Sequence, residues 1–213
     1  CSESIAMLSM LMGGGPRGPP TDLLKFYRGE APDSCGRMLS DFWAFGMDQM
    51  EMQHDYIQFM FPTDQPSRFN MDAPDFPPEM QEKFRNDEVI VSNLQKSLSH
   101  FCDFLGYEIE RKDSSVTISR GAQYDERSPN WLEPMFGMGN HNWLRLSRVL
   151  HCLKIANLEA EKMALYDALE ASFKEKGLDR GPGAETMKFW RTYGGIEGRG
   201  ELLPPKGAGK GFR

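Results

Sequence analysis

The sequence predicts a mainly α-helical domain with one small β-hairpin, a long proline-rich loop, and extended termini rich in glycine and proline. Three observations support this fold class. Apolar residues recur at helical spacing over 78–105 and again over 140–176. The stretch YEIERKDSSVTISR at 107–120 instead alternates apolar and polar residues around a polar turn, which is typical of a hairpin. Five prolines between 62 and 78 remove backbone donors and disfavour regular structure there.

The chain is predicted to divide into an extended N-terminal arm (1–20), one helical domain (21–176) and a Gly/Pro-rich C-terminal arm (177–213). Its 213 residues are enough for a single domain with a sizeable core. A net charge of -6 argues against binding to nucleic acid or to anionic membrane surfaces. No apolar run approaches the roughly 20 residues that cross a bilayer, so we expect a free or peripheral protein that does not span a membrane.

Residues suited to helix ends locate the predicted helices. Thr21 is the expected N-cap of a short helix that Gly29 ends, and a second short helix over 38–50 is weakened by Gly46.

The longer helices have clearer signals at their ends. One long helix is expected from about 78 to 105, with Gly106 at its C-terminal end. Asn140 can cap the next helix, Asn157 breaks it, and Gly177 ends the last one.

The segment HDYIQFMFP at 54–62 mixes polar side chains with a dense aromatic and aliphatic set, and it ends at a proline. One interpretation is a structural corner, in which each buried apolar side chain stabilises the fold by about 1.5–3 kcal/mol. His54 and Gln58 would then satisfy backbone groups of the following loop, and Pro62 would turn the chain. The alternative is a site that contacts a ligand. We favour the structural corner.

The helix over 141–155 places four polar or reactive side chains on one face, at spacings of four, three and four: His141, Arg145, Arg148 and Cys152. One interpretation is a site for an anion or carboxylate, because arginine forks suit such groups. The other, which we favour, is a solvated or ion-paired helix surface. Together with Asn142, the residues His141, Arg145 and Arg148 remain the best candidates for anion or partner contact.

No catalytic residue, cofactor or metal site is predicted. The four histidines are scattered along the chain, without a nucleophile or carboxylate at a suitable spacing. Each is more simply a packing residue, with a metal or pigment ligand as the alternative. The stretch GGGPRGPP at 13–20 lacks the lysine of a phosphate-binding loop. The four cysteines are scattered, without a CxxC pair. These patterns predict a protein that is not an enzyme.

Two stretches carry a family resemblance: HDYIQFMFPTDQPSRFNMDAPDF at 54–76 and NHNWLRLSRVLHCLKIANLE at 140–159, with HFCDFLGYEI at 100–109 between them. In this order and spacing the chain resembles the conserved domain of the opioid growth factor receptor family, from about Leu23 to Phe173. The residues that carry the first motif are His54, Tyr56, Ile57, Gln58, Phe61, Pro62, Asn70 and Ala73.

The resemblance implies a helical domain whose best-known animal members bind an enkephalin peptide and associate with the nucleus. Our leading hypothesis for this chain is a non-catalytic interaction module that acts as an accessory subunit of a larger assembly. Its terminal arms would bind neighbouring protein subunits, which would order them. The alternative is a soluble receptor-like module for a peptide or small ligand, with His141, Arg145 and Arg148 near its pocket.

The chain begins at Cys1 instead of methionine. A targeting segment removed on import would explain this, so we expect an organelle, a chloroplast or mitochondrion, as its location. The alternative location is the cytoplasm or nucleus.

Overall fold

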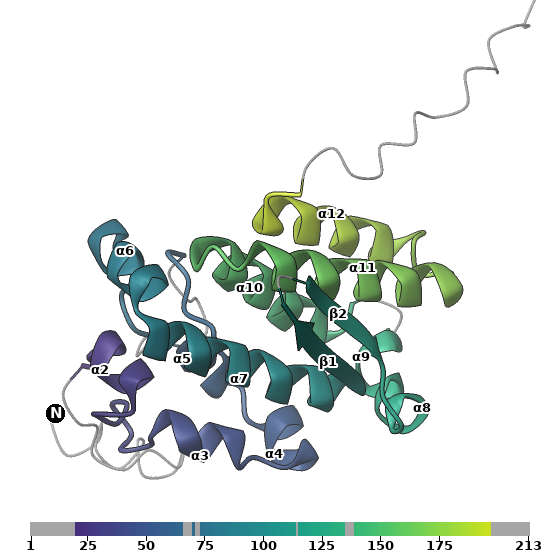
Figure 1. The fold of residues 1–213 in the computed structure, drawn as a ribbon. Coiled ribbons are helices and arrows are strands. Elements are labelled where there is room, and N and C mark those ends of the chain that lie inside the picture. The colour runs from purple at the N-terminus through teal and green to yellow at the C-terminus, as the bar shows by residue number, and fades with distance from the viewer. Residues whose placement is uncertain (1–19, 66–69, 71–72, 114, 135–138, 197–213) are drawn as a thin grey trace, which may run out of the picture.

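The computed structural model describes residues 20–65, 70, 73–113, 115–134 and 139–196. The fold is mainly α-helical with one antiparallel hairpin in the described residues, as predicted (Figure 1). No helix in this part of the chain is both long and apolar enough to cross a membrane. In chain order the elements are α2 (Leu23–Arg28), α3 (Leu39–Trp43), α4 (Met47–Met52), α5 (Tyr56–Met60), α6 (Pro78–Asn86), α7 (Glu88–Leu105), β1 (Tyr107–Lys112), β2 (Ser115–Arg120), α8 (Tyr124–Arg127), α9 (Pro129–Leu132), α10 (His141–Ile155), α11 (Glu159–Glu175) and α12 (Pro182–Gly194).

The short helices α2 to α4 begin at different caps from those predicted. Asp22, not Thr21, caps α2, and its side chain accepts a hydrogen bond from the Lys25 backbone N–H. The Thr21 hydroxyl instead accepts from the backbone N–H of Ser34, so it is engaged in the following turn. The second predicted helix is two helices, α3 and α4, because the chain is extended at Gly46, the N-cap of α4.

The predicted single helix over 78–105 is also two helices, α6 and α7, and the prediction is wrong at their junction. Asp87 has an extended backbone (φ -96°, ψ 111°), and its carboxylate accepts from the backbone N–H groups of Val89 and Ile90. The carboxylate also pairs with Arg28 at 2.6 Å. Asp87 therefore gives the N-terminus of α7 the acceptor that an uninterrupted helix would not need.

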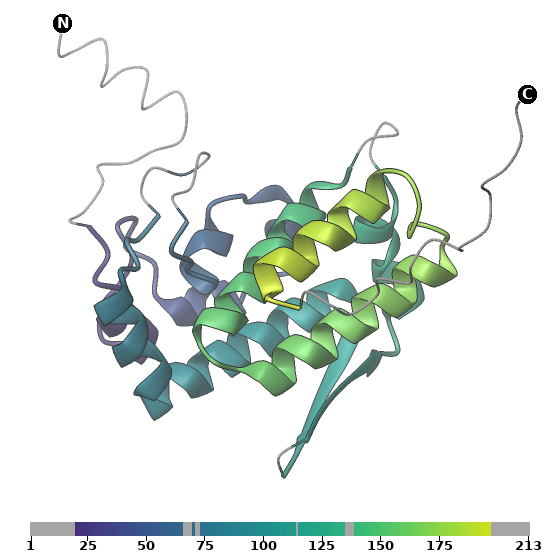
Figure 2. The ribbon, with the colours of Figure 1, turned by 90° about the horizontal axis from the view of Figure 1, so that it is seen from above.

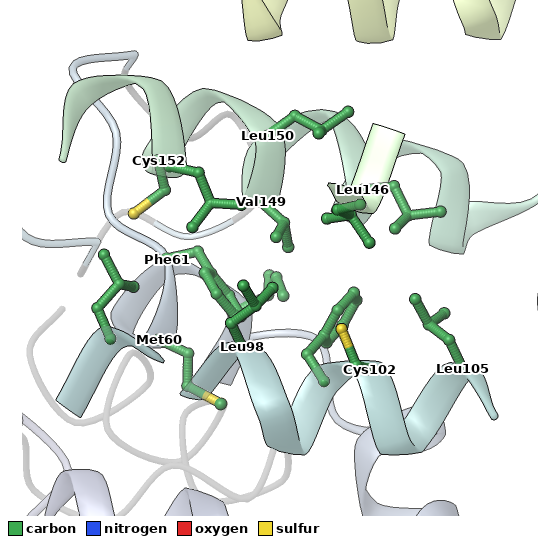
Figure 3. Close-up of a cluster of buried hydrophobic side chains, with 14 of the residues drawn as sticks. Met60, Phe61, Leu98, Cys102, Leu105, Leu146, Val149, Leu150 and Cys152 are labelled. Carbon is green, nitrogen blue, oxygen red and sulfur yellow. The ribbon is translucent and has the colours of Figure 1, made fainter. Parts of the chain in front are cut away.

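The centre of the core lies between α7 and α10, with α5 inserted from the side (Figure 3). The side chains that meet there are Leu98, Cys102 and Leu105 of α7, Leu146, Val149, Leu150 and Cys152 of α10, and Met60 and Phe61 from the end of α5. All nine are almost completely buried. A buried side chain of the Val, Leu or Phe class stabilises the fold by about 1.5–3 kcal/mol, so this layer fixes how α10 sits over the rest.

The hairpin packs against α7 and α11, and buried hydroxyls of Tyr107 in β1 and Tyr124 in α8 connect both elements to α11. The hydroxyls of Tyr107 and Tyr124 both hydrogen-bond to the Ser172 hydroxyl, at 2.6 and 2.7 Å. Burial raises the pKa of Tyr107, which keeps its proton in place. Gly106 ends α7 with φ +87°, and a Cβ there would lie 2.7 Å from the Tyr124 Cα, so this position requires glycine.

The segment that begins the predicted C-terminal arm (177–213) includes α12, so the prediction of an extended arm is wrong over Pro182–Gly194. Figure 2 shows α12 lying along α10 and α11. Trp190 is fully buried, and its Nε1–H donates to the Trp143 carbonyl at 2.9 Å. The free energy gained by burying the side chains of Trp190 and Met187 outweighs the local preference of glycine and proline for irregular structure. The remaining predicted arms, 1–19 and 197–213, lie outside the described residues.

Candidate functional site

The segment 54–62 is a corner between α4 and the proline-rich loop. All five residues of α5 are buried, and the Phe61 ring packs edge-on against Phe101 of α7, with ring centroids 5.6 Å apart. Pro62 is buried and follows directly. Of the motif residues, Tyr56, Ile57, Gln58, Phe61 and Pro62 are buried, Asn70 and Ala73 are half-buried, and His54 is exposed.

Arg145 holds this corner from α10. Its side chain is only 5% exposed. Nη1 donates to the Met50 carbonyl at 2.8 Å, and Nη2 donates to the carbonyls of Gln53 (2.8 Å) and Glu51 (3.2 Å). These carbonyls belong to the C-terminal end of α4, where the helix leaves its last acceptors without partners. A cation placed there satisfies them and also complements the helix dipole.

Polar side chains at the start of α10 meet the same end of α4. Asn142 donates to Glu51 Oε2 at 3.1 Å, and His141 Nε2 lies 3.1 Å from Glu51 Oε1. Burial lowers the pKa of His141 and outweighs the opposing charge of Glu51, so the imidazole is neutral at physiological pH. The His54 ring lies edge-on to it, with centroids 5.6 Å apart, and His54 Nδ1 is 3.0 Å from Arg145 Nη2. Within the described ranges, no three His, Cys, Asp or Glu residues are placed to hold a metal ion.

The polar residues predicted on one face of α10 thus serve different neighbours. Arg145 is buried against α4, so this part of the helix is not a solvated surface. Arg148 is one turn further along, and its Nε–H donates to the Phe61 carbonyl at 2.8 Å. Cys152 is fully buried in the core, and burial raises the pKa of its thiol. A buried thiol of this kind is a packing residue, not a nucleophile.

A surface groove of about 230 Å³ lies between α10 and α12. Three large apolar side chains on its rim are exposed: Leu144 by 67%, Phe189 by 55% and Tyr193 by 38%. The rings of Phe189 and Tyr193 are near-parallel, with centroids 6.4 Å apart. Exposed apolar side chains gathered at one depression are typical of a binding surface. The described residues that line the groove are Thr63, Gln65, Leu144, Ser147, Arg148, His151, Phe189 and Tyr193.

The groove contains the residue types of a serine-hydrolase triad, but not its geometry. His151 Nε2 lies 3.2 Å from Asp64 Oδ1, as a histidine oriented by a carboxylate would. The Ser147 hydroxyl, however, donates to the Trp143 carbonyl at 3.1 Å and makes no hydrogen bond to His151. A serine without a base in reach is not an activated nucleophile. The described residues of the groove therefore do not form a catalytic triad.

The three apolar residues on the rim of the groove were missed in the sequence for two reasons. Leu144 adds one more apolar residue to a helix that is rich in them, although it lies off the stripe formed by Leu146, Leu150 and Leu153. Phe189 and Tyr193 lie in α12, which was assigned to an extended arm. Gly181–Pro182 before this stretch and Gly195 after it are signals for the start and end of a helix.

Comparison with known proteins matches the family described as "Opioid growth factor receptor (OGFr) conserved region" over residues 21–178, which confirms the resemblance found in the sequence. The opioid growth factor receptor of Homo sapiens is 29% identical over 145 residues, which are 65% of this chain and 20% of that protein. The opioid growth factor receptor-like protein 1 of Xenopus tropicalis is 27% identical over 140 residues, which are 63% of this chain and 26% of that protein. The match thus covers between a fifth and about a quarter of each of these relatives. No solved structure matches the chain.

Proposed function

Because the chain belongs to the opioid growth factor receptor family through its conserved region, we propose that it is a non-catalytic interaction module. It binds a segment of a partner protein in the groove between α10 and α12. The observation that carries this proposal is the cluster of three exposed apolar side chains, Leu144, Phe189 and Tyr193, around one groove. Such residues gain stability only when a partner covers them.

The size of the groove favours a protein segment over a small molecule. Pockets for drug-sized ligands and cofactors measure about 300–1,000 Å³, and this groove has about 230 Å³. That volume suits one anchoring side chain, the usual centre of a protein interface. Leu144, Arg148 and His151 stand at i, i+4 and i+7 on α10, and Phe189 and Tyr193 stand at i and i+4 on α12. Two such rows form a channel along which an extended or helical segment can lie.

The family relationship supports binding in preference to catalysis. The relatives are named receptors, a term for proteins that bind. In this chain, Arg145 is occupied by backbone carbonyls, Cys152 is enclosed in the core, and the Ser147 hydroxyl is directed to its own helix. None of these groups is left in a position to attack or protonate a substrate.

A selection from a random 12-residue peptide library tests the groove. The selected peptides, labelled with fluorescein, are titrated with the full chain and with two variants, and binding is measured by fluorescence polarisation. Leu144→Asp places a charge on the apolar rim and is expected to weaken binding at least about tenfold. Val89→Asp makes the same chemical change at an exposed position outside the groove lining and is the matched control. The proposal would be refuted if the library yields no binder. It would also be refuted if the selected peptides bind the Leu144→Asp variant with the same affinity as the wild type.

We also carry forward the narrower hypothesis that the chain is an accessory subunit of a larger assembly, within an organelle, whose arms bind neighbouring subunits. The described part of the domain extends to Ile196, which is 6% exposed, so this hypothesis takes 197–213 as the C-terminal arm. The test compares the full chain with a chain lacking 1–19 and 197–213, each purified from the native source and sized with its co-purifying proteins identified. A large complex for the full chain alone supports the hypothesis. Two monomers would exclude it and would leave the groove proposal intact.

A further inference from the structure

Arg148 brings a positive charge to the groove that no carboxylate among the described residues neutralises. Its side chain lines the groove, and its Nε–H is taken by the Phe61 carbonyl at 2.8 Å. No residue in the described ranges accepts a hydrogen bond from its two Nη groups. Burial lowers the pKa of Arg148, with Cys152 and Tyr27 opposing this effect, but a guanidinium stays charged at neutral pH. The two Nη groups are thus free to donate to a ligand.

The other charged groups around the groove do not cancel this charge. Asp64 is directed to His151, at 3.2 Å, and not to Arg148. Burial lowers the pKa of His151, so it is neutral at physiological pH, and the charges of Lys154 and Arg148 act in the same direction. Arg148 is thus the one charged side chain among the described residues that line the groove, although the whole chain has a net charge of -6. A local positive field in an acidic protein favours an anionic ligand at this place.

Resting on the function proposed above, we propose that the groove recognises a partner segment in which a Glu or Asp side chain stands beside a large apolar residue. The carboxylate accepts two hydrogen bonds from the Nη groups of Arg148. The apolar side chain packs against Leu144 and the two rings of α12, Phe189 and Tyr193. Each half of the ligand thus meets a group of the groove that the chain itself leaves without a partner.

A carboxylate fits this site better than a phosphate. One guanidinium matches one carboxylate in charge and in the geometry of a two-bond fork. A phosphorylated side chain carries a charge of about -1.5 to -2 and three acceptor oxygens, which clusters of arginine satisfy. Arg148 is the sole arginine among the described residues that line this groove. The same count argues against a nucleic-acid backbone, which needs several cations in a row.

A synthetic peptide series tests this assignment on the full chain. Each peptide carries two large apolar residues that flank Glu, Gln, Lys or phosphoserine, and both ends are blocked so that the central side chain is the only ionised group. A further Gln peptide has a free C-terminus, to detect recognition of a terminal carboxylate. Affinities are measured by fluorescence polarisation on the wild type, on Arg148→Met, and on Leu144→Asp. Circular dichroism establishes that each variant is folded.

We expect the Glu peptides to bind the wild type at least about tenfold more tightly than the Gln peptides, as for a desolvated charge pair. Arg148→Met should remove that preference, so that the Glu and Gln peptides bind this variant equally tightly. Should Arg148→Met fail to fold because the Phe61 carbonyl loses its donor, Arg148→Lys retains the charge without the fork and should reduce the preference.

Three results would overturn the assignment, and they are distinct from failure of the proposed function. If the Glu and Gln peptides bind the wild type equally and neither binds the Leu144→Asp variant, the groove is a purely apolar site. Tighter binding of the phosphoserine peptide would show that the groove recognises a phosphate. Tighter binding of the peptide with a free C-terminus would show that it recognises a terminal carboxylate. If no peptide binds the wild type, the proposed function itself fails, and the assignment fails with it.

Discussion

Replacing Arg145 by methionine should lower the free energy of unfolding by about 3–5 kcal/mol, because three buried backbone carbonyls lose their charged donor. The variant keeps most of the apolar stem but removes the donors to the carbonyls of Met50, Glu51 and Gln53. Each buried acceptor left without a partner costs about 1–3 kcal/mol, and partial hydration of α4 reduces the sum. Because a domain is typically stable by about 5–15 kcal/mol, the variant should still fold.

Urea denaturation of the full chain, followed by far-ultraviolet circular dichroism and tryptophan fluorescence, measures this loss. Arg145→Lys retains a charge but has a single donor group, so we expect about half of the effect, near 2 kcal/mol. Arg180→Met makes the same change at an exposed position on the surface, and we expect it to stay within about 0.5 kcal/mol of the wild type. A loss below about 1 kcal/mol for Arg145→Met would show that water satisfies these carbonyls. The account of Arg145 as the residue that holds the corner would then be wrong.

Three further perturbations test other parts of the fold. Ser172→Ala leaves two buried tyrosine hydroxyls without their shared partner and should destabilise by about 1–3 kcal/mol, measured by urea denaturation; no change would mean that the hydroxyls find other partners. Asp87→Ala removes the cap of α7 and should lower the free energy of unfolding by about 1–2 kcal/mol. Asp87→Asn keeps an acceptor for the cap and loses only the pair with Arg28, so it should lower this free energy by less than half as much. Burial lowers the pKa of His151 in the folded chain. As the pH falls below 6.5, this histidine is therefore protonated more readily in the unfolded chain than in the folded chain, and the free energy of unfolding should decrease. The melting temperature of His151→Gln should decline less than that of the wild type between pH 8 and pH 5, and parallel declines would contradict this explanation.

The fold class was predictable because its signals are local. The spacing of apolar residues in α7 and α10 and the alternation in the hairpin report which residues face the core, whatever the neighbouring elements are. The breaks between helices were harder to predict. Asp87 reads as one polar residue within a helical pattern. The structure shows that it both caps α7 and pairs with Arg28, which is 59 residues away.

The candidate site was less predictable because it depends on distant contacts. The spacing of Arg145 and Arg148 on one helix was read correctly, but it does not tell which carbonyls each will meet. Arg145 contacts α4, about 95 residues earlier in the chain, and its guanidinium donors are engaged by backbone carbonyls there. The rim of the groove requires α12 to pack beside Leu144, and the decisive residue for that packing, Trp190, lies within a stretch whose composition is otherwise that of a linker.

Arg148 connects the groove to the family motif. Through Nε it holds the carbonyl of Phe61, which begins the proline-rich loop, and its Nη groups are directed to no other described residue. A carboxylate bound at the Nη groups would fix the guanidinium plane and thereby strengthen the bond to Phe61. A ligand that binds only the folded state at 100 times its Kd adds about 2.7 kcal/mol of stability. Part of that gain should therefore appear as protection of the backbone amides in the corner at 54–62 from hydrogen exchange, although no residue of 54–62 is among the described residues that line the groove. If protection rises along the groove and not at this corner, Arg148 binds the ligand without connecting it to the motif.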